Sequence, residues 1–250
     1  MIEINGLYKS FAEHEVLRDL DLVIEQGESL VIIGRSGCGK SVLLKHIIGL
    51  MRPDRGIIKV NGLDVSRARG RELNSMRKDF GMLFQGAALF DSMTVVENVG
   101  FQLLEYTDMS EKEISLRVAE CLEMVGLRGV ENIKPAELSG GMKKRVGLAR
   151  AICMWPKIIL FDEPTTGLDP IMGDVINDLI RELHERLKIS SVTVTHDMKS
   201  AYKIADRIAM LYDKKIIAAG TPSDIKNSDN GVVRQFITGR AKGPITIREE

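Results

Sequence analysis

Apolar and polar residues alternate along the first part of the chain in a manner typical of β-strands. Residues 2–4 and 20–24 alternate in this way, and a continuous apolar run follows at Ser29–Ile33. A further apolar stretch, Ile57–Val60, ends at Asn61-Gly62, a dipeptide typical of a tight hairpin turn. We therefore expect a strand-rich N-terminal part in which Ile57–Val60 is one arm of a hairpin.

The spacing of apolar residues becomes helical between about residues 92 and 125. Ser110, followed three residues later by Glu113, is typical of a helix start. Two further helices are predicted over residues 139–152 and 175–187. Within residues 92–125, the apolar positions that follow Ser110 are three or four residues apart, at Ile114, Val118, Leu122 and Val125.

Short apolar runs alternate with these helices, at residues 80–85, 158–161 and 191–195. Strands that alternate with helices predict an α/β fold with a mostly parallel sheet. The antiparallel N-terminal part precedes this core, and a helical insertion interrupts it at about residues 90–150. We assign residues 1–225 to one domain and residues 226–250 to a C-terminal extension.

Composition excludes several classes of protein. The chain has 35 basic and 35 acidic residues, so no net charge favours nucleic acid as a partner. Three widely spaced cysteines, Cys38, Cys121 and Cys153, argue against a disulfide framework and suit a reducing compartment. Because the first residues lack a basic segment followed by an apolar one, we expect no secretory signal. No apolar run is long enough to span a bilayer.

The strongest chemical signal directly follows the apolar run at residues 30–33. It reads Gly34-Arg35-Ser36-Gly37-Cys38-Gly39-Lys40-Ser41 and precedes a helix-compatible segment. Glycines let backbone N–H groups surround an anion at a helix N-terminus, and the lysine adds a positive charge for β- and γ-phosphates. The serine hydroxyl is suited to Mg²⁺. The sequence therefore predicts a site that binds a nucleotide and Mg²⁺, and this loop alone leaves kinases, GTPases and motor ATPases open.

Further motifs narrow the class. Leu138-Ser139-Gly140-Gly141-Met142 lies upstream of the apolar run that ends in Asp162-Glu163. Gly167-Leu168-Asp169-Pro170 follows, Gln85 ends an earlier strand, and His196 ends a later one. In order and spacing, this set resembles the ATP-binding cassette (ABC) proteins over residues 1–225. The resemblance implies a P-loop NTPase (RecA-like) fold with an inserted helical subdomain, and ATP hydrolysis in a head-to-tail dimer with two ATP sites.

The resemblance also implies roles for individual residues. The catalytic residues are Glu163 as general base, His196, Lys40 and Gln85. The Mg²⁺ ligands are Ser41, Gln85 and Asp162. The nucleotide-binding residues are Phe11, Gly34, Arg35, Ser36, Gly37, Cys38, Gly39, Lys40, Ser41, Val42, Ser139, Gly140, Gly141 and Asp169.

One of these assignments has an alternative, and two positions depart from the usual family sequence. Phe11 is the residue expected to stack on adenine, with Tyr8 as its competitor. Val42 stands where the family usually has threonine, which removes one hydroxyl contact to the α-phosphate. Met142 replaces the usual glutamine at the end of its motif, while Ser139 and Gly141 are kept.

Met142, the stretch from Met82 to Phe90 and the tail at Val233–Phe236 together resemble the ATPase subunit of Mla-type phospholipid transporters. The resemblance implies an integral membrane permease that contacts the stretch after Gln85. It also implies an MCE-domain lipid-binding protein, a STAS-domain protein, and a place on the cytoplasmic face of the inner membrane. The alternatives are the ATPase of a polar-solute importer, such as an amino-acid system, and a soluble ABC ATPase acting on ribosomes or DNA.

Overall fold

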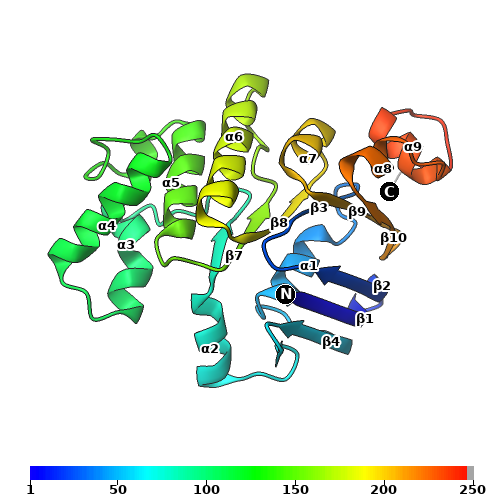
Figure 1. Cartoon of the computed structure of the whole chain (residues 1–250), viewed down its shortest axis with the longest axis horizontal. Coiled ribbons are helices and arrows are strands. Elements are labelled where there is room, and N and C mark those ends of the chain that lie inside the picture. Colours follow the sequence, from blue (N-terminus) through cyan, green and yellow to red (C-terminus); the bar gives the residue numbers. More distant parts are fainter. Residues whose placement is uncertain (247–250) are drawn as a thin grey trace. The chain divides into compact units, whose positions relative to one another are not determined.

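The computed structural model describes residues 1–246 (Figure 1). The chain forms two compact units. The first unit consists of Met1–Ala68 and Val194–Glu250, and the second consists of Arg69–Thr193. Among the described residues, no helix is long and apolar enough to cross a membrane.

An antiparallel sheet of four strands opens the first unit. In sheet order the strands are β2 (His14–Ile24), β1 (Ile2–Phe11), β4 (Arg55–Val60) and β5 (Leu63–Asp64). Val60 pairs with Leu63 across the Asn61-Gly62 turn, so the predicted hairpin is confirmed. Alternate side chains of β1 and β2, among them Ile4 and Leu22, are buried on one face, as the alternating pattern requires.

Among its described residues, the first unit also contains parallel strands and four helices. β3 (Ser29–Ile33) is buried along its whole length and runs parallel to β9 (Arg207–Tyr212), which pairs antiparallel with β10 (Lys215–Gly220). The helices are α1 (Lys40–Ile47), α7 (Met198–Ile204), α8 (Pro222–Lys226) and α9 (Gly231–Thr238).

In the second unit, β6 (Phe80–Leu83) runs parallel to β7 (Ile158–Asp162). β8 (Ser190–Thr195) lies next to β7, and its last residues already belong to the first unit. The parallel pairs confirm the predicted mostly parallel α/β core. β6 is shorter than predicted because the chain turns after Leu83, where the Ala87 N–H bonds to the Phe84 carbonyl.

Helices make up the rest of the second unit. They are α2 (Gly70–Lys78), α3 (Val95–Tyr106), α4 (Glu111–Met124), the short 3₁₀-helix η1 (Pro135–Glu137), α5 (Gly140–Ile152) and α6 (Pro170–Leu187). The predicted helix start at Ser110 is confirmed, since Ser110 and Glu113 bond to each other's backbone N–H groups. Thr94 and Glu97 form the same arrangement, which sequence analysis missed.

α6 begins earlier than residue 175, where it was predicted to start. The Asp169 carboxylate accepts hydrogen bonds from the N–H groups of Ile171 and Met172, at 2.9 and 3.0 Å, and Pro170 occupies the first turn. An aspartate cap followed by proline is a strong start signal. Local capping therefore extends the helix beyond its apolar pattern.

After α9, the chain folds back onto this helix. The buried Gln235 side chain donates to the carbonyls of Arg240 and Ile245 and accepts the Ile245 N–H. These bonds curl the segment, and residues 244–245 lie in a bend. Ile247 and the last three residues of the extension lie outside the described residues.

Candidate nucleotide-binding site

The glycine-rich loop of the first unit joins β3 to α1. Gly37 and Gly39 have positive φ angles of 79° and 105°, a backbone region that strongly favours glycine. A Cβ on Gly39 would lie 2.9 Å from Val16 Cγ1, and a Cβ on Gly34 would lie 2.5 Å from the Leu211 carbonyl oxygen. The backbone conformation and the lack of room for a Cβ atom therefore both require glycine in this loop.

Lys40 is the first residue of α1 and is only 5 % exposed. Its ammonium group donates to the carbonyls of Gly34, at 2.8 Å, and Arg35, at 3.0 Å. The cap residue Gly39 has no side chain, so it makes no side-chain cap hydrogen bond to the first turn. The loop thus combines a positive charge with a helix N-terminus, the arrangement that binds phosphate in many proteins.

Two other predicted residues belong to the first unit. Phe11 ends β1 with 44 % of its side chain exposed, and Lys9 Nζ lies 5.5 Å from its ring centroid. Such an exposed ring is available for stacking, whereas Tyr8 is half-buried. His196 is exposed and follows β8, and Asp197 caps α7 by accepting N–H groups of Lys199 and Ser200.

The paired carboxylates lie in the second unit, where β7 ends. Asp162 is the last residue of this strand, and Asp162 and Glu163 are 7 % and 8 % exposed. Glu163 has a φ angle of 48°, and the Thr166 hydroxyl donates to its carboxylate at 3.2 Å. A left-handed backbone at a residue other than glycine is costly, and such strain is concentrated at functional sites.

Lys144 of α5 joins two predicted residues in one cluster. Its ammonium group donates to the backbone carbonyls of Gln85 and of Glu163, the latter at 3.2 Å. Burial lowers the pKa of Lys144, and the charges of Asp162 and Glu163 partly oppose that shift. Sequence analysis missed this lysine, although its position three residues after Gly141 places it on the buried face of α5.

A second cation, the half-buried Arg150, supports the backbone of the stretch after Gln85. Arg150 donates to the carbonyls of Ala87 and Ala88, at 2.6 and 2.7 Å. Both alanines have positive φ angles, 61° and 48°. Arg150, which the sequence did not indicate, therefore stabilises an otherwise unfavourable backbone conformation in this stretch.

The start of α5 lies close to the start of α6. Ser139 caps α5, accepting the N–H of Met142 at 3.3 Å, and Gly140 is exposed. A Cβ on Gly141 would lie 2.6 Å from Met172 Cε. Within the second unit, the motif at Ser139–Gly141 is thus close to the helix that Asp169 caps.

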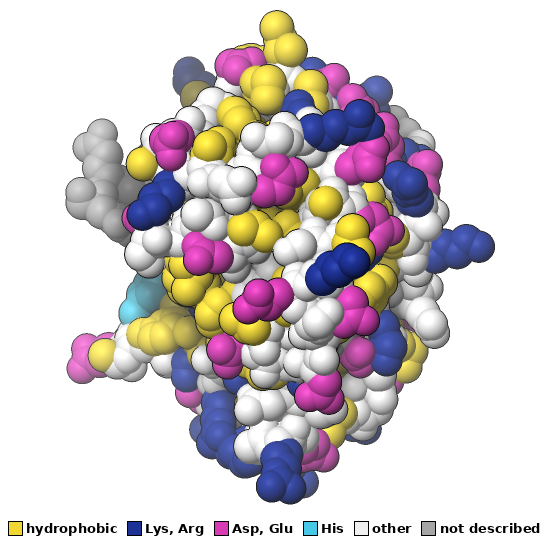
Figure 2. All heavy atoms as spheres, turned by 90° about the vertical axis from the view of Figure 1, so that its left-hand side faces the viewer, with side chains coloured by type: hydrophobic (Ala, Val, Ile, Leu, Met, Phe, Trp, Pro, Cys, Tyr) yellow, Lys and Arg dark blue, Asp and Glu magenta, His cyan; other side chains and the backbone are white. Residues whose placement is uncertain are grey.

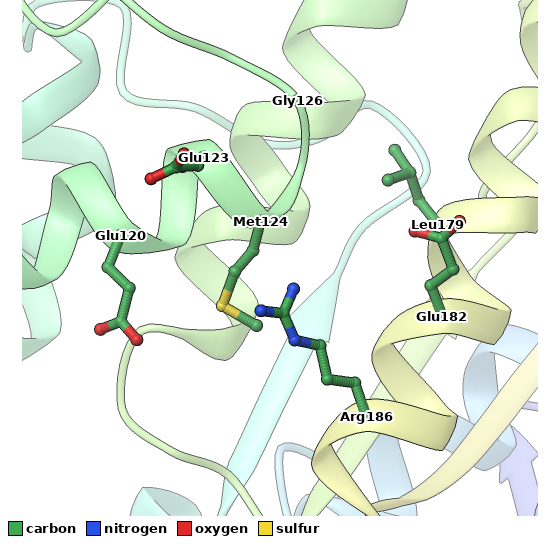
Figure 3. A pocket seen from close by; sticks show the side chains of 7 residues that line it. All are labelled: Glu120, Glu123, Met124, Gly126, Leu179, Glu182 and Arg186. Atoms are coloured by element: carbon green, nitrogen blue, oxygen red, sulfur yellow. The ribbon is translucent and has the colours of Figure 1, made fainter.

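A cavity of about 470 Å³ lies elsewhere in the second unit, between α4 and α6 (Figure 3). Its lining residues are Glu120, Glu123, Met124, Gly126, Leu179, Glu182 and Arg186. None of them belongs to the predicted site, and the cavity lies apart from the residues described above.

Comparisons with known proteins agree with these observations. A family model described as "ABC transporter" matches residues 17–166. The chain is 45 % identical to the "Probable ribonucleotide transport ATP-binding protein mkl" of Mycobacterium tuberculosis strain H37Rv, covering all of this chain and 69 % of that protein. It is 41 % identical to the "Intermembrane phospholipid transport system ATP-binding protein MlaF" of Haemophilus influenzae, covering 99 % and 94 %.

Among solved structures, the chain resembles the ATP-binding cassette MJ0796, which was solved as a dimer bound to ADP and inorganic phosphate. The TM-score is 0.82 and the identity 34 %, over 89 % of this chain and 99 % of that one. The glycine-rich loop, the carboxylates after β7 and the sequence matches agree: this chain is a member of the ABC transporter family and has its ATPase fold.

Proposed function

We propose that this chain is the ATP-hydrolysing subunit of a membrane transporter that moves phospholipids between membranes. The observation that carries the proposal is the similarity to MlaF, which extends over nearly the whole of both chains. Mkl, whose name refers to ribonucleotides, is matched over a smaller share of its length. The motif residues at Met142 and Met82–Phe90 independently favour the phospholipid class.

In this proposal the N–H groups of the loop Gly34–Ser41 and the Lys40 ammonium bind the phosphates of ATP. Glu163 is the general base that takes a proton from the attacking water. Its buried position and its bond from Thr166 favour that role by fixing the carboxylate. The other proposed site residues are His196, Gln85 and Asp169. Phe11 stacks on adenine.

Mg²⁺ suits the oxygen donors of Ser41, Gln85 and Asp162. Magnesium prefers hard oxygen ligands and usually keeps several waters and substrate phosphates in its shell, so few protein ligands are needed. When bound, it would offset negative charge on the phosphates.

We further propose a head-to-tail dimer, in which Ser139–Gly141 of each subunit faces ATP on the other. Exposure of Ser139 and Gly140 at a helix start supports this proposal, as does the dimer recorded for the related cassette. Two domains are also proposed here, residues 1–225 as the cassette and 226–250 as an extension.

The permease would dock on the stretch after Gln85, where Phe90 is 45 % exposed and its ring packs, tilted by 50°, against that of Phe101, with ring centroids 5.2 Å apart. Figure 2 views the molecule from the side that carries α3 and α4 and shows apolar side chains interspersed with charged ones. An MCE-domain protein and a STAS-domain protein are further proposed partners. The chain would then lie on the cytoplasmic face of the inner membrane.

The test is reconstitution with the permease that co-purifies with the full chain. We expect ATP-dependent transfer of a fluorescent phospholipid between vesicles, and loss of this transfer when Glu163 is replaced by glutamine. Radiolabelled ribonucleotide and amino acids are offered in parallel. ATP-dependent uptake of one of these solutes without phospholipid transfer would overturn the lipid assignment while leaving the ATPase assignment intact.

A further inference from the structure

Two cysteines that are distant in sequence meet where α4 packs against α5. Cys121 lies on α4, Cys153 lies directly after the last turn of α5, and both side chains are fully buried. The two thiol side chains interact with each other. Neither cysteine was assigned to the candidate nucleotide site.

Arg117 fixes the relative position of the two cysteines. It lies one helical turn before Cys121 on α4 and is 7 % exposed. Its guanidinium donates to the carbonyls of Cys153, at 3.1 Å, and Ile152, at 3.0 Å. Its guanidinium carbon also lies over the Trp155 ring, 4.2 Å from the ring centroid. The end of α5 is therefore held against the face of α4 that carries Cys121.

The surroundings make the two thiols chemically different. Its interaction with Cys153 lowers the pKa of Cys121, burial opposes this shift, and the charge of Arg117 adds to it. The same interaction and burial raise the pKa of Cys153. The thiolate is the reactive form of cysteine, and the positive charge of Arg117 favours it at Cys121.

We propose that Cys121 and Cys153 form a peroxide-sensitive pair that closes to a disulfide between α4 and the end of α5. A small oxidant suits the site because both sulfurs are fully buried. Two interacting thiols on packed elements already have the proximity that the reaction needs, and Arg117 holds the backbone in place.

The chemistry balances with hydrogen peroxide as the oxidant. The Cys121 thiolate attacks one peroxide oxygen, the O–O bond breaks, and the released hydroxide takes a proton to become water. Cys121 is then a sulfenic acid. The Cys153 sulfur attacks it, the S–O bond breaks, and the hydroxyl leaves as a second water with the Cys153 proton. Two thiols and one peroxide thus give one disulfide and two waters.

The disulfide would close a covalent loop over residues 121–153, which includes α5 and its start at Ser139–Gly141. Closing such a loop restricts the unfolded chain and so raises thermal stability. Oxidation would therefore stabilise the helical part of the second unit, and reduction would reverse the effect.

The experiment exposes the purified full chain to hydrogen peroxide and maps its peptides by mass spectrometry without reduction. We expect one cross-linked peptide pair joining Cys121 to Cys153, with a mass lower by two hydrogen atoms. We also expect the melting temperature to rise by about 5 °C or more and to return after reduction.

Three variants serve as comparisons. Cys38→Ser should still form the cross-link, whereas Cys121→Ala and Cys153→Ala should lose both the cross-link and the rise in melting temperature. Peptide mapping of the unsubstituted chain needs no variant, so the test stands even if an alanine variant folds poorly. Oxidation of Cys121 or Cys153 to a sulfinic acid without the cross-link would overturn the proposal. Recovery of both as free thiols in a sample in which Cys38 has been oxidised would also overturn it.

Discussion

The ammonium group of Lys144 donates a hydrogen bond to the backbone carbonyl of Glu163, with 3.2 Å between the two atoms. The same group bonds to the carbonyl of Gln85. One side chain of α5 therefore fixes two residues that were assigned to catalysis on the basis of sequence. Glu163 has an unfavourable backbone conformation, which this bond to its carbonyl helps to hold. Because the backbone sets the direction of the side chain, the bond also contributes to the position of the carboxylate.

Replacing Lys144 by methionine should lower ATP turnover at least about tenfold while changing the ATP dissociation constant little. Two carbonyls would lose their donor, which also costs about 1–3 kcal/mol of unfolding free energy. Steady-state ATPase assays and nucleotide titration measure the two effects. The neighbouring change Lys143→Met is the control and should retain turnover. Equal turnover in both variants would show that Lys144 does not position the site.

Replacing Glu163 by glutamine should preserve ATP binding and lower turnover by roughly 10²–10⁴-fold, because the amide cannot accept a proton from water. In the proposed cycle the dimer opens only after hydrolysis, so the variant should accumulate as an ATP-loaded dimer in size-exclusion chromatography. Glu105→Gln, a change on the outer part of α3, is the control. Turnover near that of the unsubstituted chain would remove Glu163 from the role of general base.

Alkylation should be faster at Cys38 than at Cys121 or Cys153, and MgATP should slow it. Cys38 is half-buried in the glycine-rich loop, near Lys40, whereas the other two are buried. Positive surroundings favour the reactive thiolate. Timed labelling with iodoacetamide and peptide mass spectrometry give the three rates. Equal labelling of Cys38 with and without nucleotide would argue against its place in the site.

Acidification below pH 6.5 should destabilise the fold in part through His46. This side chain is fully buried on α1, where Nδ1 lies 2.7 Å from the Val42 carbonyl, and desolvation lowers its pKa. The unfolded chain therefore takes up a proton at a higher pH than the folded chain. The unfolding free energy is highest above pH 6.5 and falls as the pH drops toward the lowered pKa.

Urea denaturation at several pH values between 8 and 5 measures this effect. His46→Leu lacks the titrating group, so its stability relative to the unsubstituted chain should improve as the pH falls. A stability difference that stays constant across this range would contradict the assignment.

Replacing Gln235 by alanine should release the segment that follows α9. Its side chain bonds to the backbone at Arg240 and at the buried Ile245, so trypsin should cleave after Arg240 and Lys242 several-fold faster in the variant. Arg234→Gln, an exposed change in the same helix, is the control. Equal cleavage rates would show that Gln235 does not hold the segment.

Deletion of residues 239–250 tests whether the extension also joins two subunits. Weaker dimerisation or weaker retention on the permease, with unchanged nucleotide binding, would support that role. If assembly and transport are unchanged, the described residues 239–246 serve only to pack against α9 of their own subunit. The first result is the one expected if the extension reaches beyond its own subunit.

The sequence by itself determined the elements whose signals are local. The glycine-rich loop, the strand before Asp162 and the capping serine at residue 110 each depend on neighbouring residues, and each lies where it was predicted. The hairpin at Asn61-Gly62 is of the same kind, because a two-residue turn fixes its own strand pairing. Motif order and spacing likewise sufficed to indicate the family.

Tertiary structure alone decided which distant groups meet. The bonds of Lys144 to Gln85 and Glu163, the support of Ala87 by Arg150, and the contact between Cys121 and Cys153 join residues far apart along the chain. A helical pattern shows that a position is buried but does not show which carbonyl or thiol lies opposite. That partner depends on how whole elements pack, and packing is a property of the folded chain rather than of any short segment.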